Sequence, residues 1–390
     1  MCGLLVFHYG LWRLAVPVVL MEDGRFRTFY DHTIMNNDMN RPNLFQIASS
    51  ELSQDAFFAW LMQWADPSNM QEDPALCTAG QDFIRFILGK GGESKGIPKI
   101  DKVIVCKQVV TSNEPRKRKD IIDLWVEVND RFLIVIEDKT GSVEHSKQLD
   151  RYREVAEKYC AEKNMLSTLI YLKTQDETKS KINVVTEKGF CFIGRKDLLS
   201  FFSTHSVEND IYKDFVSNLD RIEALSESFL TRPIGKWSRG SWCGFLSYLD
   251  EVRDKDDWGE WKYVANRSGG FLGACWHFLP WRDYRVYLQI EQNIHENELG
   301  PCRLCFKIQH VKDNHVKVRK DWANVVLAHA KECGYAEIRP AGTRKGGNMT
   351  VATIDRKDWL GPDGSIVDLE QVAARLHKYE KFLDECVSRQ

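Results

Sequence analysis

The sequence lacks an excess of charge of either sign. Its 390 residues include 54 Lys and Arg against 56 Asp and Glu, which gives a formal net charge of −2. The chain as a whole has no basic field that would attract nucleic acid, so any phosphate binding must come from local clusters of cations. The hydrophobic fraction of 43% and the charged fraction of 28% are typical of a globular protein, and the length allows two domains.

A disulfide framework is also missing. Eleven cysteines are scattered from Cys2 to Cys386 without regular spacing, which favours reduced thiols and a cytoplasmic location. The CxxC pair, Cys302 and Cys305, lies in an apolar run that is typical of a strand. Because no second Cys or His pair accompanies it, a zinc site there is the less favoured interpretation.

Long apolar runs and phosphate loops are absent as well. Residues 4–20 are apolar, but Arg13 interrupts them, no basic segment precedes them and they are short for a membrane span. We expect no membrane association and treat residues 1–44 as an N-terminal extension, which an upstream start codon before Met39 would explain. In the glycine-rich stretch 89–96 no Ser or Thr follows either lysine, so it is not a Walker A loop and we expect no motor in this chain.

What is present is a predicted β-hairpin. Residues 121–128 and 132–136 are rich in β-branched and aromatic side chains, and 129–131 form a turn between them. A three-residue loop makes one face of the hairpin apolar, with these pairs: Val128 with Phe132, Val126 with Ile134, and Leu124 with Ile136. A two-residue loop would place Val128 against Arg131, and we reject it for that reason.

The other face of this hairpin brings acidic groups together. Asp123 lies beside Glu137, Lys139 projects from the same side, and Asp138 points to the opposite side. Adjacent carboxylates repel each other unless a cation neutralises them, and all-oxygen ligation favours Mg²⁺ or Mn²⁺ over zinc. A lysine beside such a metal can position water and balance charge that develops on a phosphate. The alternative is a surface hairpin with an ordinary lysine–carboxylate pair.

The hairpin and the next helix carry three features in a fixed order: Asp123, the triplet Glu137-Asp138-Lys139 at the end of an apolar strand, and Gln148-x-x-x-Tyr152. The combination resembles the PD-(D/E)XK nuclease superfamily, and the Gln and Tyr resemble the extra motif of its helicase-associated exonuclease branch. The resemblance implies that Asp123 and Glu137 bind metal with the backbone carbonyl of Asp138, and that Lys139 is the catalytic lysine. Ile122 replaces the proline of the motif's name, a position that varies widely in the superfamily.

The resemblance also implies roles for flanking residues. The first core helix of the family contributes an acidic residue near its start, and Glu51 matches that place in the helix expected at 51–65. Complementing the helix dipole explains Glu51 equally well. Gln148 and Tyr152 share a helix face and would orient Lys139 or the substrate, unless the helix is solvated and buries only the tyrosine.

A basic run directly precedes the hairpin: Arg116, Lys117, Arg118 and Lys119. Four cations at this position would hold a phosphate backbone near the scissile bond. A solvated loop is the other interpretation of such a run.

Hydrophobic patterns predict an α/β domain over residues 45–232. The expected elements are helices at 51–65 and 81–88, strands at 100–110, 121–128 and 132–136, a helix at about 143–163, strands at 166–172 and 190–193, and helices at 196–202 and 208–230. This order agrees with the restriction-endonuclease-like core, a mixed sheet flanked by helices, that the resemblance implies.

Pro and Gly at 231–235 interrupt the last of these helices and predict a domain boundary. Eight of the twelve tryptophans lie between Trp237 and Trp359. Strands are expected at 271–279, 284–291, 303–310 and 349–354, and helices at 318–333 and 367–386. We therefore predict a C-terminal Trp-rich α+β domain over residues 236–390, of unassigned role. Most of its tryptophans should be core, although exposed ones would stack on bases or anchor a partner.

The pattern as a whole predicts a Mg²⁺- or Mn²⁺-dependent nuclease whose partner is nucleic acid, preferentially DNA. By analogy, such a protein would serve phage defence, restriction or repair, with an ATPase or sensor in trans as the motor or switch. The alternatives are a catalytically inactive nuclease-like module that binds nucleic acid or a partner protein, and an RNA-directed enzyme of the same fold.

Overall fold

The computed structural model describes residues 19–20, 26–27, 42–92, 99–110, 121–139, 147–253, 258–265, 270–295, 298–342 and 346–389. The chain divides into two compact units, residues 1–43 and 44–390. In the first unit, β1 (Val19–Leu20) pairs antiparallel with β2 (Phe26–Arg27). Within the described residues, no helix is both long enough and apolar enough to cross a membrane.

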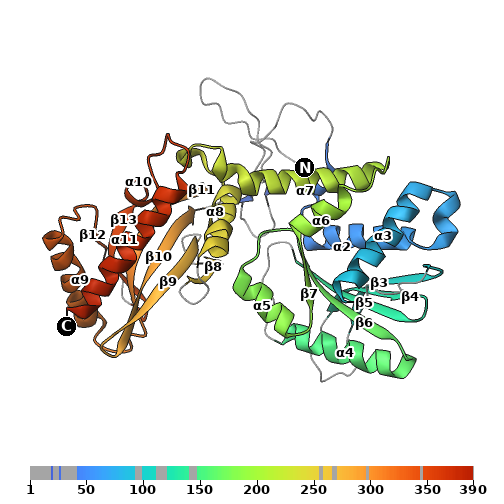
Figure 1. The fold of residues 1–390 in the computed structure, drawn as a ribbon, viewed down its shortest axis with the longest axis horizontal. Helices are drawn as coiled ribbons and strands as arrows, with labels where there is room; N and C mark the ends of the chain where they lie inside the picture. Colours follow the sequence, from blue (N-terminus) through green and yellow to red (C-terminus); the bar gives the residue numbers. More distant parts are fainter. Residues whose placement is uncertain are drawn as a thin grey trace. The chain divides into compact units, whose positions relative to one another are not determined.

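The N-terminal half of the second unit contains a five-stranded mixed sheet (Figure 1). Its strands, in spatial order, are β3 (Val103–Val110), β4 (Ile121–Val128), β5 (Phe132–Lys139), β6 (Leu166–Lys173) and β7 (Cys191–Gly194). The first three are antiparallel, and β6 and β7 continue the sheet in parallel. Val128 pairs with Phe132 and Leu124 with Ile136, so the predicted hairpin register and the mixed α/β fold are both confirmed.

Helices cover both faces of this sheet (Figure 1). The face of Leu124, Val126 and Ile134 packs in one apolar cluster with α2 (Glu51–Trp64), α3 (Pro74–Lys90), α6 (Arg195–Phe202) and α7 (Asp210–Glu227), beside the short α1 (Leu44–Ile47). The opposite face packs with α4 (Gln148–Lys163) and α5 (Lys179–Glu187). The central strand β5 is buried on both sides, and this explains why its residues 132–136 are all apolar.

The start of α4 differs from the prediction. The sequence pattern places it near Val143, but Lys147 has a φ of 70°, which a helix does not continue through. The helix therefore begins at Gln148. Residues 140–146, including the predicted cap at 141–142, lie outside the described residues.

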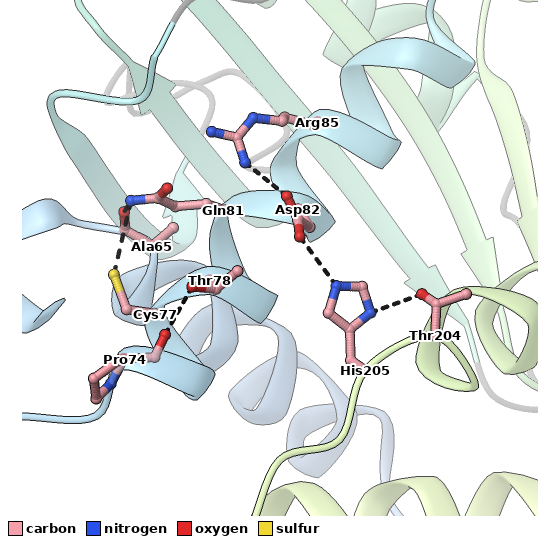
Figure 2. A network of polar contacts seen from close by, with 9 residues as sticks. All are labelled: Ala65, Pro74, Cys77, Thr78, Gln81, Asp82, Arg85, Thr204 and His205. Carbon is pink, nitrogen blue, oxygen red and sulfur yellow. Dashed lines mark hydrogen bonds and ion pairs between the residues drawn. The ribbon is translucent and has the colours of Figure 1, made fainter.

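Polar contacts tie α3 to its neighbours (Figure 2). Asp82 accepts from Arg85 at 2.6 Å and lies 3.2 Å from Nε2 of His205, in the segment between α6 and α7. Gln81 donates to the carbonyl oxygen of Ala65 at 3.1 Å, at the end of α2. These contacts connect α3 to the end of α2, which carries candidate site residues, and to the segment between α6 and α7.

The C-terminal half is built on a six-stranded antiparallel sheet. Its strands, in spatial order, are β12 (Arg339–Pro340), β13 (Met349–Asp355), β11 (Glu298–Gln309), β10 (Tyr284–His295), β9 (Phe271–Trp281) and β8 (Trp258–Val264). The helices are α8 (Arg239–Val252), α9 (His315–Glu332), α10 (Arg356–Trp359) and α11 (Leu369–Ser388). The predicted C-terminal α+β arrangement is thereby confirmed, although β8, β12, α8 and α10 were not anticipated.

Most tryptophans of this half are core residues, as expected. Six of them share one apolar cluster with the helices at 4% exposure or less: Trp237, Trp242, Trp276, Trp281, Trp322 and Trp359. Cys302 and Cys305 are buried in β11 and, three residues apart along a strand, point to opposite faces. The structure therefore does not bring the CxxC pair together as a metal site.

Helix α7 runs into two short 3-10 turns, η2 (Ser228–Leu230) and η3 (Ile234–Lys236), and then α8. The division of the second unit at 232–236 stays a prediction. Gly244 marks the tightest contact between α7 and α8, because a Cβ there would lie 2.0 Å from the carbonyl oxygen of Ser226.

Gly244→Ala should lower the free energy of unfolding by roughly 1–3 kcal/mol, because the added methyl forces the two helices apart. Gly89→Ala in α3 is the matched control, since a Cβ there meets nothing within 4 Å. It should be neutral or stabilising by up to about 1 kcal/mol. Urea denaturation of both variants checks this, and equal stabilities would contradict the close approach.

Candidate active site

The candidate site lies where β4 and β5 run side by side, at the C-terminal end of β5. The backbone N–H of Asp138 donates to Oδ2 of Asp123 at 2.9 Å, which fixes that carboxylate across the two strands. Lys139 Nζ lies 2.5 Å from Oε1 of Glu137 and 3.8 Å from Oδ2 of Asp123. Asp123, Glu137 and Lys139 thus share one side of the hairpin, as the register predicted.

Lys139 also donates to the backbone carbonyl of Asp138 at 3.0 Å. Its ammonium therefore contacts the three groups to which the family resemblance assigns metal binding: Asp123, Glu137 and the Asp138 carbonyl. A cation is accordingly already favoured at this position, and in this structure the lysine supplies it.

The Asp138 side chain points to the opposite face, toward α2. Its Oδ1 accepts a hydrogen bond from Nε2 of Gln54, whose Oε1 in turn accepts one from Thr174 at 2.6 Å. All three residues are buried. This chain of bonds links α2, β5 and the segment after β6, and so holds the end of β5 in place.

Helix α2 brings two acidic residues to the site. Glu51, the predicted one, is the first residue of α2, and its charge raises the pKa of both Asp123 and Lys139. Asp55, one turn later, is 1% exposed and was not predicted. The spacing of four residues, which places both on one helix face, was the available signal.

A family model described as the PD-(D/E)XK nuclease superfamily matches residues 42–222. The resemblance to this superfamily is thereby confirmed for residues 42–222, a little under half of the chain. The match contains the whole five-stranded sheet and every candidate site residue that the structure describes. Comparison with curated proteins found no match, and neither did comparison with solved structures.

Burial dominates the electrostatics of this PD-(D/E)XK site. Burial and the Asp123 charge raise the pKa of Glu137 to about 8. Burial and the Asp123 charge also raise the pKa of Asp55 to about 6. The pKa of Asp138 lies well above its usual range, through burial and the neighbouring Asp55, while burial raises that of Asp123 against the opposing charge of Lys139. Without a further cation, burial therefore favours the protonated form of Glu137 at neutral pH.

Lys139 behaves in the opposite way. Burial by itself would lower its pKa, but the Glu137 carboxylate, with Asp123 and Glu51, raises it above the ordinary value. The side chain therefore stays cationic at neutral pH.

The donor set fits a hard divalent ion of the kind this superfamily uses. Both carboxylate oxygens of Glu137 are fully buried, and the Lys139 ammonium lies 2.5 Å from Oε1, which shows that this position attracts a cation. Asp123 and the Asp138 carbonyl offer further oxygen ligands beside them, and an all-oxygen set suits Mg²⁺ or Mn²⁺. A bound cation would offset the repulsion between the carboxylates that now raises their pKa values.

The Gln-x-x-x-Tyr pair begins α4. Gln148 Nε2 donates to the hydroxyl of Tyr152 at 2.6 Å, and that hydroxyl donates to the backbone carbonyl of Ile121. Ile121 precedes Asp123 by two residues in β4. These hydrogen bonds connect the pair to the strand of Asp123, whereas an orienting contact with Lys139 stays a prediction. The basic run Arg116–Lys119 lies outside the described residues.

Metal affinity should rise with pH up to about 8, because Glu137 must lose a proton before it binds a cation. The raised pKa of Glu137 also makes stability depend on pH. Between pH 4.5 and about 8, the folded metal-free protein binds more protons than the unfolded chain. The free energy of unfolding should therefore fall as pH rises through this range.

Calorimetric Mg²⁺ titrations and thermal unfolding at pH 6 and 8 check both trends. Glu137→Gln should flatten them. Glu127→Gln, the matched control in β4, should preserve them. A metal affinity of wild type that does not change with pH would contradict the proton displacement.

Tyr152→Phe should weaken Mg²⁺ binding severalfold and cost about 1 kcal/mol of stability, because the lost hydroxyl anchors β4 next to Asp123. Tyr159→Phe is the matched control on α4, since its hydroxyl bonds to Glu127 at 2.8 Å, away from the site. It should lower stability without changing the metal affinity. Equal metal affinities of the two variants would remove the positioning role of Tyr152.

Proposed function

We propose that the protein is a Mg²⁺- or Mn²⁺-dependent nuclease that hydrolyses phosphodiester bonds, preferentially in DNA. The observation that carries the proposal is the meeting of Asp123, Glu137 and Lys139 at one end of two paired strands within a PD-(D/E)XK region. The superfamily by itself supports only a nuclease-like module. The cleavage activity, the metal and the choice of DNA are our inference.

In this proposal Asp123, Glu137 and the Asp138 carbonyl hold the metal, and Glu51 completes the set. The bound ion would lower the pKa of a water and neutralise charge on the scissile phosphate. Lys139 acts as a cation, because its raised pKa makes it a poor base. It donates hydrogen bonds to the attacking water and to the phosphate oxygen on which charge develops.

Other parts of the chain act through position. Gln148 and Tyr152 hold β4, and through it Asp123, in register. The Gln54–Asp138 bond fixes the end of β5 from the other face. We assign the Arg116–Lys119 run to the phosphate backbone on charge and sequence proximity alone.

The cellular setting follows from analogy. Buried cysteine thiols such as Cys77, Cys160 and Cys386 suit a reducing cytoplasm. Phage defence, restriction or repair is the role we favour. Because the sequence has no Walker A loop, we propose that any energy-dependent step requires an ATPase or sensor in trans.

A plasmid assay with Mg²⁺ or Mn²⁺ tests the proposal. Wild type should convert supercoiled DNA to nicked or linear forms, or degrade linear DNA. Asp123→Ala, Glu137→Ala and Lys139→Ala should each lower the rate by at least about a hundredfold, because each removes charge that the reaction needs. Lys102→Ala is the control, since Lys102 pairs with Asp130 at the far end of the hairpin.

Equal cleavage by wild type and Lys139→Ala would refute the assigned site. Parallel reactions with single-stranded DNA and with RNA separate DNA-directed from RNA-directed activity.

A catalytically inactive, nucleic-acid-binding or protein-binding module is the second candidate. The observation that favours it is the contact of Lys139 with all three expected metal ligands, since an ion can enter only if the lysine moves. This candidate would be supported over the enzyme if the protein shifts DNA in a mobility-shift assay but cleaves no DNA or RNA substrate with Mg²⁺ or Mn²⁺.

A further inference from the structure

A second group of possible metal ligands lies in the C-terminal half, far along the sequence from the PD-(D/E)XK residues. His329 in the last turn of α9 and Cys333 directly after that helix face Glu385 of α11. His329 Nε2 lies 2.7 Å from Oε2 of Glu385, and Cys333 Sγ lies 3.6 Å from both ring nitrogens of His329. The nitrogen, sulfur and oxygen atoms of the three residues lie within 4.8 Å of one another.

These separations are close to those of a tetrahedral metal site. Zinc–sulfur and zinc–nitrogen bonds of about 2.3 and 2.0 Å at a tetrahedral angle place sulfur and nitrogen about 3.5 Å apart. The observed sulfur–nitrogen distance of 3.6 Å is close to that value. The nitrogen–oxygen contact must open by roughly 0.6 Å, and the Glu385 side chain, which is 59% exposed, can make this adjustment in solvent.

We propose that His329, Cys333 and Glu385 form a binding site for Zn²⁺ or a similar transition-metal ion, with water as the fourth ligand. A thiolate, an imidazole and a carboxylate together select such an ion over Mg²⁺. The site is therefore chemically distinct from the all-oxygen set around Asp123.

The fold prepares this site before any metal arrives. His329 is 2% exposed, and its ring stacks on Phe382 with a centroid separation of 4.8 Å and an angle of 8° between the planes. The backbone N–H of Cys333 donates to the carbonyl of His329 at 2.9 Å, which continues the helical spacing and keeps both side chains on one face. Phe382 and Glu385 are three residues apart on α11, so the stacking that orients the imidazole also presents the carboxylate.

Other possible ligand groups lie near these three residues but are less suited to bind the metal. Glu332 Oε2 lies 3.9 Å from His329 Nδ1, but Glu332 also pairs with Arg389. Cys386 is fully buried and does not belong to this group of ligand atoms. Cys333 is exposed, so its sulfur is accessible to a metal ion from solvent.

Cobalt spectroscopy on the full-length, chelator-treated protein tests the proposal. Co²⁺ added in the presence of excess Mg²⁺ should produce a thiolate-to-cobalt charge-transfer absorption that saturates at one ion per chain and is removed by Zn²⁺. Cys333→Ser should abolish the absorption, and Glu385→Gln should weaken Co²⁺ binding by at least about tenfold. Both residues are at the surface, and circular dichroism verifies that the variants remain folded.

Matched controls separate this site from other binding. Glu332→Gln and Cys106→Ser, at an adjacent carboxylate and a remote exposed thiol, should change the cobalt affinity by less than about twofold. Asp123→Asn should leave the absorption unchanged, so failure of the nuclease proposal would not affect this result. A wild-type protein without the absorption, or an absorption that survives Cys333→Ser, would overturn the site and leave an ordinary His329–Glu385 ion pair.

Discussion

The crowding of carboxyl groups around Lys139 is the constraint on which the rest of this structure depends. Glu137 and Asp138 are fully buried at adjacent positions of β5, with Asp55 and Asp123 beside them. Removing such groups from water costs several kcal/mol for each ionised carboxylate. Two features lower this cost: burial raises the pKa of these acids, which favours their protonated forms, and one ammonium lies against Glu137. A bound divalent cation would be a third.

The arrangement persists because the apolar layers around it are extensive. β5 contributes to a separate cluster on each face of the sheet. The polar residues at its end are then held from both sides: Gln54 bonds Asp138 from α2, while Tyr152 anchors β4 from α4. Such rigid supports would serve the proposed nuclease activity, because small displacements of a catalytic group have large effects on rate.

The two halves of the second unit offer contrasting ligand chemistry. The PD-(D/E)XK region presents oxygen atoms that are buried and mutually repulsive, whereas the C-terminal half presents a buried imidazole with an exposed thiol and an exposed carboxylate. The tryptophans of the C-terminal half build its core. The metal site proposed for this half lies instead where α9 meets α11, and the composition of the sequence did not indicate it.

Much of the fold was accessible from sequence because its signals are local. Alternation of apolar residues and the turn at 129–131 determine the hairpin register, and with it the common face of Asp123, Glu137 and Lys139. The start of α4 escaped prediction because the left-handed backbone at Lys147 leaves no clear mark in the sequence.

Only tertiary structure decided which distant residues join the hairpin. Asp55 and Gln54 reach it from α2 because helix packing sets their direction, and the raised pKa values arise from burial that no motif encodes. The same holds for His329 and Glu385, which lie 56 residues apart and meet through the packing of α9 on α11. The sequence by itself determined the strand register and the chemical types at the hairpin, since both follow from local periodicity. The partners and the electrostatics depend on long-range packing.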